Sequence, residues 1–197
     1  MRYLRCQTTH WALRELRSGD EPQLVQYLND PELYANTLFI PYPYTESDAR
    51  DFLMLNRDLE AAHQTHFNWM ITDHEDQVIG GIGLLYEHGI TSHKSGFGYW
   101  LGAPFRSRGM MTEIVLTFCD LIFDQTGLTR LEAMVYTYNP ASARVLEKSG
   151  FTLEGLMRHA VKKEGNYVDA WFYARLKKDT APHFNGWLLP RCGPHSP

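Results

Sequence analysis

The chain has few cysteines, no long apolar run and no large excess of charge of either sign. Its three cysteines (Cys6, Cys119 and Cys192) are odd in number and far apart in 197 residues, so we expect free thiols in a reducing compartment. No segment approaches the roughly 20 consecutive apolar residues of a membrane helix, and the N-terminus lacks the apolar region of a secretion signal. We therefore expect a cytoplasmic protein that does not bind membranes.

Charge and composition narrow the class further. The net charge of −4 does not favour bulk binding to nucleic acids, and internal repeats and low-complexity segments are absent from the sequence. A hydrophobic content of 44% and a charged content of 21% are ordinary for a soluble globular protein. The length suits one domain with a substantial core, which we expect at residues 1–178, followed by an irregular Pro-rich tail at 179–197.

Apolar periodicity alternates between strand and helix along the chain. Helices are expected after Asp20, from Thr45 to about His63, after Met110 and after Asn139. Strands are expected at residues 11–16, 67–72, 78–86, 96–101, 131–138, 151–161 and 167–176. The resulting order, β-α-α-β-β-β-α-β-α-β-β, indicates a mixed α+β fold.

The central motif is the stretch 99–113, where a strand ends, a Gly/Pro break follows and a helix begins after Met110. Such a loop presents backbone N–H groups at the positive end of a helix dipole, where phosphates bind. Gly109 permits a positive φ or close ligand approach, and Arg106 and Arg108 add charge-assisted donors. The simpler interpretation is a turn with two solvated arginines. Neither a P-loop nor a G-x-G-x-x-G fingerprint is present.

A second motif, Asn139-x-x-Ser142, stands where a strand gives way to a helix. Asn139 is a typical N-cap, and Ser142 projects toward the positive end of the helix, where a thiolate would be stabilised. Both residues can equally be ordinary helix-start residues without a chemical role.

Three further residues and a set of histidines are candidates on weaker grounds. Tyr42 and Tyr44 lie in a loop fixed by prolines, where they either plug the end of the core or form one wall of a substrate pocket. Asp169 lies in a strand beside aromatics, and either binds a positively charged substrate or makes a structural hydrogen bond. No credible metal-ligand set completes the paired histidines, so no metal is expected. These histidines are His63, His66, His88 and His93.

Taken together, the motifs resemble the GNAT N-acetyltransferase superfamily, and in particular its RimJ/RimL (ribosomal-protein N-acetyltransferase-like) branch. Residues 106–111 are similar to its acyl-CoA pyrophosphate loop, with Met111 where a second small residue is usual. Residues 139–151 look like the branch's Asn-x-x-Ser to Gly-Phe block. Further matches are the Gly-Tyr-Trp strand at 98–100, the Gly-x-x-Thr-Glu helix start at 109–113, the closing hairpin from 154 to 169 and the loop at 40–45. The resemblance covers residues 11 to about 178 and implies the GNAT fold, a central, mostly antiparallel sheet of about seven strands with flanking helices.

The resemblance also implies a reaction, the transfer of acetyl from acetyl-CoA to a primary amine without a metal. The acceptor would be a protein N-terminal amine or a small amine, and the protein a monomer or homodimer. Ser142 would serve the departing thiolate, Asn139 would orient the cofactor, and a backbone N–H near Trp100 would stabilise the oxyanion. The implied acetyl-CoA-binding residues are Trp100, Leu101, Ala103, Arg106, Ser107, Arg108, Gly109, Met110, Met111, Thr112, Asn139 and Ser142, and the candidate acceptor-binding residues are Tyr42, Tyr44 and Asp169.

The sequence departs from this branch at Gly96, because many members carry Glu two residues before the Gly-Tyr-Trp strand. A missing carboxylate leaves the general base open between Glu87, His88, His93, Tyr138 and a chain of water molecules. It also leaves open a non-catalytic acyl-CoA-binding module. An unrelated α/β protein with a chance loop is the third interpretation.

Overall fold

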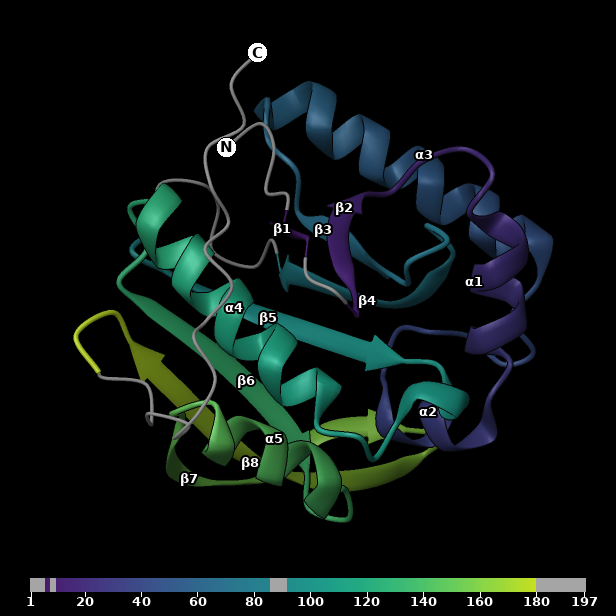
Figure 1. Cartoon of the computed structure of the whole chain (residues 1–197). Coiled ribbons are helices and arrows are strands. Elements are labelled where there is room, and N and C mark those ends of the chain that lie inside the picture. Colours follow the sequence, from purple (N-terminus) through teal and green to yellow (C-terminus); the bar gives the residue numbers. More distant parts are fainter. Residues whose placement is uncertain (1–5, 8–9, 86–91, 180–197) are drawn as a thin grey trace.

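The computed structural model describes residues 6–7, 10–85 and 92–179, and all of its strands belong to one sheet (Figure 1). The strand order is β1-β2-β3-β4-β5-β6-β8-β7. Neighbouring strands are antiparallel except β5 and β6, which are parallel. The strands are β1 Cys6–Gln7, β2 Ala12–Glu15, β3 Asn68–Thr72, β4 Val78–Leu85, β5 Lys94–Leu101, β6 Arg130–Tyr136, β7 Thr152–Lys163 and β8 Asn166–Leu176.

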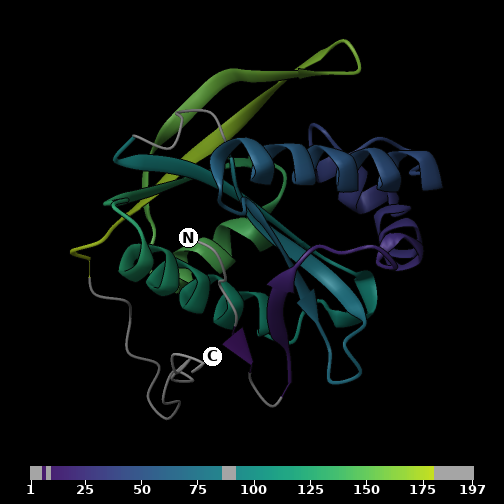
Figure 2. The ribbon, with the colours of Figure 1, turned by 90° about the horizontal axis from the view of Figure 1, so that it is seen from above.

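Helices cover both faces of this sheet, and Figure 2 shows α3 and α4 on opposite sides of it. One core lies under α4 and α5 and includes Ile114, Phe118 and Leu146. The other core lies under α1 and α3 and includes Leu24 and Leu53. The helices are α1 Glu21–Leu28, α2 Pro31–Asn36, α3 Glu46–His63, α4 Met110–Gln125 and α5 Pro140–Lys148, with a 3-10 turn, η1, at Ala103–Phe105.

The predicted mixed α+β fold with a mostly antiparallel sheet is confirmed. The seven predicted strands are all present, and the eighth is the two-residue edge strand β1. The helix α2 is absent from the predicted elements, because Asp30-Pro31 is equally typical of the end of a helix. The Asp30 carboxylate accepts hydrogen bonds from the N–H groups of Glu32 and Leu33, and Pro31 occupies the first turn, where its missing N–H is harmless. The same dipeptide therefore ends one helix and starts the next.

Close backbone approach explains the glycines of β4. A Cβ atom on Gly81 would lie 2.4 Å from the indole Nε1 of Trp100, so the Trp100 ring occupies the space above the glycine. The ring thereby packs across the strand and joins the core under α1 and α3. This packing turns Trp100, and with it residues 96 and 98 of the same strand face, away from the core under α4.

Several expectations concern residues outside the described part of the chain. Glu87 and His88, residue Cys192 and the tail from residue 180 lie there, as does the side chain of Cys6. Cys119 is described and is a buried free thiol. None of the helices in the described residues is long and apolar enough to cross a membrane. The division into a domain at 1–178 and a tail stays a prediction.

Candidate active site

The site begins where β5 and β6 separate. Their parallel pairing joins Lys94–Gly96 to Arg130–Glu132, and within the described residues it stops there, although both strands continue (Figure 1). The Gly102 N–H donates to the Ile79 carbonyl at 2.8 Å. Since N–H directions alternate along an antiparallel strand, the N–H groups of Tyr99 and Leu101 point away from β4 and toward β6. The two strands therefore splay beyond Gly96, with backbone donors on the edge of β5.

The loop that follows β5 delivers the chain into α4. Ser107 and Gly109 both have positive φ, 63° and 77°, and Gly109 is the N-cap of α4, as its predicted role requires. In the described structure no side chain caps this helix, so the first-turn N–H groups remain available to an anion. Met111 and Thr112 bury their side chains. Any ligand at this helix start would therefore meet their backbone.

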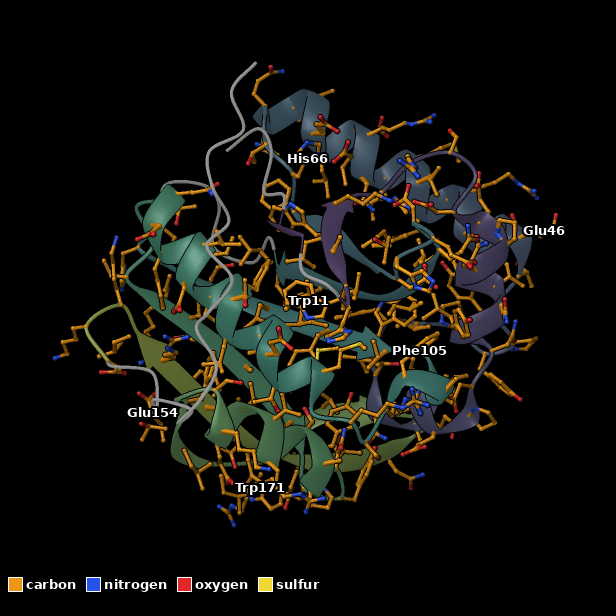
Figure 3. The ribbon with its side chains drawn as sticks, viewed as in Figure 1. Trp11, Glu46, His66, Phe105, Glu154 and Trp171 are labelled. Carbon is orange, nitrogen blue, oxygen red and sulfur yellow. The ribbon has the colours of Figure 1, made fainter. Side chains whose placement is uncertain are left out.

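Arg106 has partners that its predicted role did not anticipate. Its Nε donates to the Leu101 carbonyl at 2.7 Å, and its guanidinium pairs with the carboxylates of Asp30 at 2.7 Å and Glu32 at 3.2 Å. The side chain thus ties the loop to the N-terminal end of α2. The neighbouring Phe105, labelled in Figure 3, adds an apolar contact, because its ring meets Tyr27 of α1 edge-on at 5.7 Å. Arg108 is exposed.

The second motif meets β5 through one hydroxyl pair. The Asn139 side chain accepts a hydrogen bond from the Ser142 N–H at 3.1 Å and so caps α5 as expected. The Ser142 Oγ lies 2.7 Å from the hydroxyl of Tyr99, which also donates to the Ser142 carbonyl at 3.3 Å. Burial raises the pKa of Tyr99 well above its ordinary range. The sequence analysis named Tyr99 only as part of its strand, because its contact with Ser142 spans 43 residues.

The candidate acceptor-binding residues differ in exposure. Tyr42 is 47% exposed, and its ring centroid lies 5.5 Å from that of Tyr34 on α2. Tyr44 is only 5% exposed and belongs to the core under α1 and α3, where burial raises its pKa to about 12. Asp169 accepts a hydrogen bond from the backbone N–H of His159 at 2.7 Å, at an irregular step between β7 and β8. The structural role that the sequence left open for Asp169 is therefore present.

A set of contacts around α2, here called the α2 clasp, ties this short helix to Tyr138, just after β6, and to the end of β7 and its turn into β8. Lys163 donates from Nζ to the carbonyls of Tyr34 at 2.6 Å and Thr37 at 2.5 Å, and lies over the Tyr34 ring at 3.8 Å. The Tyr34 hydroxyl donates to Glu164, and the Tyr138 hydroxyl to the Ala35 carbonyl, both at 2.7 Å. These partners are about 100 to 130 residues apart in sequence, so no local pattern signals them.

The position of Gly96 brings no carboxylate of its own to the splay. A Cβ on Gly96 would meet the Leu85 side chain at 3.1 Å, so Leu85 occupies that space. Its paired residue, Glu132, binds Lys94 and Arg130; burial acts to raise the pKa of Glu132, but these two cations lower it overall. Burial raises the pKa of Tyr138, and its hydroxyl already donates to a carbonyl. Tyr138 is therefore poorly suited to accept a proton near neutral pH.

A splayed sheet, a helix start without a side-chain cap beside it and a hydroxyl pair across it suit an enzyme that binds a phosphate-bearing donor. Residues 11–152 match the protein family described as "Acetyltransferase (GNAT) domain". The chain is 32% identical to the uncharacterized N-acetyltransferase p20 of Bacillus licheniformis, over 88% of this chain and 97% of that protein. It belongs to the GNAT acetyltransferase family and is an N-acetyltransferase, as the resemblance implied.

Solved structures share the fold at low sequence identity. The ribosomal-protein-S5-alanine acetyltransferase of Vibrio fischeri matches with a TM-score of 0.78 and 22% identity, over 89% of this chain and 98% of that one. RimL, a ribosomal L7/L12 α-N-protein acetyltransferase in complex with coenzyme A, matches with a TM-score of 0.75 and 21% identity, over 86% and 95%. The neighbours thus include RimJ/RimL-like enzymes, and the RimL structure holds coenzyme A.

Proposed function

We propose that the protein transfers the acetyl group of acetyl-CoA to a primary amine, either a protein N-terminal amine or a small amine. The observation that carries this proposal is the Ser142–Tyr99 contact, which brings the first turn of α5 to the splayed edge of β5. Three residues after Tyr99, the chain enters the loop to α4 at Gly102. The loop at residues 102–112, here called the donor loop, therefore meets the backbone N–H groups of β5 and the Ser142 hydroxyl at the C-terminal end of one strand.

The residues present fit acetyl-CoA. A Cβ placed on Gly98 or Gly109 would meet no atom within 4 Å, so the backbone is open at both positions. We propose that the N–H groups from Ser107 to Met111 bind the pyrophosphate and that the backbone at Trp100 to Ala103 binds the pantetheine arm. When bound, acetyl-CoA supplies an activated thioester to this end of β5. The chemistry needs no metal at the site.

The chain's own groups then act on two atoms, the carbonyl oxygen and the sulfur of the thioester. A backbone N–H of Tyr99 or Leu101 donates to the oxygen that becomes negative as the amine nitrogen attacks the carbonyl carbon. The new C–N bond forms while the C–S bond breaks, and the Ser142 hydroxyl supplies the proton that sulfur takes. Water takes the proton that the nitrogen loses, and a proton from water restores the Ser142 hydroxyl. Positioning the two reactants contributes the largest share, about 7–11 kcal/mol of the barrier.

We further propose that the acceptor enters beside α2, with Tyr42 at the surface and Tyr44 as structural support beneath it. Tyr42 is half exposed, whereas Tyr44 is buried. Asp169 already accepts a backbone hydrogen bond, so in this proposal it shapes the strand β7 near the entrance. Thiol release measured with N-terminal peptides, polyamines, aminoglycosides and amino acids would identify the acceptor class.

The decisive test is Ser142→Ala. We expect kcat to fall about 100-fold, since a well-placed proton donor contributes about that much, while the Kd for CoA stays within twofold. Ser47→Ala is the control, because Ser47 is exposed and lies in the first turn of α3, on the opposite side of the sheet from α4. A Ser142→Ala enzyme with unchanged kcat would overturn the proposed role of Ser142. CoA binding without release of thiol for any amine would overturn the proposed reaction.

A further inference from the structure

We infer that Tyr99 is a positioning residue that acts through Ser142: its hydroxyl donates into the Ser142 Oγ and leaves the serine's own proton free for the departing sulfur. The inference rests on the proposed function and extends it to a residue buried behind the reacting atoms. Tyr99 does not itself need to touch either substrate.

The geometry allows this direction of donation, because either oxygen of the hydroxyl pair can be the donor. The Tyr99 hydroxyl lies 2.7 Å from the Ser142 Oγ and 3.3 Å from the Ser142 carbonyl, so the contact with Oγ is the shorter one. A serine hydroxyl has one proton and two lone pairs, and a tyrosine hydroxyl has one proton. When Tyr99 gives its proton to Oγ, the Ser142 proton must find another acceptor. The sulfur that gains negative charge at the splay is such an acceptor.

Burial keeps Tyr99 in the role of donor. Its ring packs at 5.8 Å from the ring of Phe97 on the core face of β5. Because burial raises the pKa of Tyr99, the phenol stays protonated across the pH range in which a primary amine reacts. A protonated donor at 2.7 Å stabilises the Ser142 oxygen as it loses its proton. The phenol thus makes Ser142 a better acid without a charged neighbour.

A second tyrosine provides the matched control. Tyr173 of β8 is 1% exposed, and its hydroxyl donates at 3.0 Å to the carboxylate of Glu147, which lies on the same helix α5 as Ser142. Tyr99→Phe and Tyr173→Phe therefore each remove one buried hydroxyl that is hydrogen-bonded to α5. They differ in that only the first hydrogen bond ends on Ser142.

The experiment measures kcat, KM for the amine and Kd for CoA in the wild-type protein, Tyr99→Phe, Tyr173→Phe, Ser142→Ala and the double variant Tyr99→Phe/Ser142→Ala. We expect Tyr99→Phe to lower kcat about tenfold with both substrate constants within twofold, the effect of one hydrogen bond to a reacting group. Tyr173→Phe should keep the wild-type kcat. Because Tyr99 acts through Ser142, the double variant should be no slower than Ser142→Ala alone.

The outcomes separate the inference from the proposed function. A wild-type kcat in Tyr99→Phe, or an extra tenfold loss in the double variant, would overturn the inference while the reaction stands. Equal losses of kcat in Tyr99→Phe and Tyr173→Phe would reduce Tyr99 to a structural anchor of α5 and would also overturn it. If the wild-type protein releases no thiol with any amine, the proposed function and the inference fail together. Thermal unfolding of each variant shows whether the folded state has been kept.

Discussion

The donor loop, residues 102–112, and the α2 clasp lie at the same end of the molecule but are built in opposite ways. The donor loop is one continuous stretch, and its functional groups are backbone N–H groups placed by the positive φ of Ser107 and Gly109. The clasp consists of side chains from the segment after β6, the end of β7 and its turn into β8 that meet α2, such as Lys163 on the Tyr34 carbonyl. A backbone site leaves a local signature in sequence, whereas a side-chain site across the fold does not.

This difference suggests a division of labour. The proposed donor site uses backbone groups, and a loop of that kind tolerates changes of side chain, as Met111 at a usually small position illustrates. The clasp depends on individual side chains. We therefore expect a substitution of one of these side chains to alter entry of the acceptor amine beside α2 without altering the donor loop. We therefore expect variants of the two regions to affect different substrate constants.

Among variants of these two regions, the largest effect on a substrate constant is expected for Gly109→Ala. A side chain at φ 77° costs about 1–2 kcal/mol, and relief of this strain would move the first-turn N–H groups of α4. We expect the Kd for CoA to rise at least tenfold, measured by calorimetry. Gly19→Ala is the control, since Gly19 also has positive φ, 100°, and an open Cβ position, but lies between β2 and α1. An unchanged Kd in Gly109→Ala would show that the donor does not depend on this helix start.

Lys163→Met should have the next largest effect, on the other substrate. The substitution keeps an apolar stem of similar length but removes the Nζ that holds two carbonyls at the end of α2. We expect the KM for the amine to rise about fivefold, since the loss of a charged hydrogen bond loosens the helix, with the Kd for CoA unchanged. The neighbouring Lys162 is exposed, and Lys162→Met is the matched control. A rise in the Kd for CoA of the same size would remove the distinction between the regions.

Arg106→Met tests the residue that joins the donor loop to the start of α2, and its expected effect is the smallest. The guanidinium pairs with Asp30 and Glu32, so its loss should raise both the KM for the amine and the Kd for CoA about threefold. Arg108→Met, at an exposed position of the same loop, is the comparison. A rise above tenfold in the Kd for CoA alone would instead make the Arg106 guanidinium a direct ligand of the pyrophosphate.

The helices show where local signals suffice. Thr45 and Asp48 form a capping box at the start of α3, and the helix begins where Thr45 predicted it. Asn139 likewise caps α5. The Asp30-Pro31 pair was ambiguous, because proline both ends a preceding helix and suits the first turn of a new one. Only the observed bonds from Asp30 decide for α2.

Within the described residues, the sequence by itself determined seven of the eight strands, four of the five α-helices, the donor loop and the Asn139–Ser142 motif, because each of these follows from periodicity, caps and glycines within a few residues. Only the tertiary structure decided which side chains surround them. It pairs Tyr99 with Ser142, assigns Arg106 to α2 and buries Tyr44 in the core. Contacts such as Tyr99 with Ser142 and Tyr34 with Glu164 join residues from about 40 to 130 positions apart. Such pairs are set by how strands and helices pack, which no local pattern encodes.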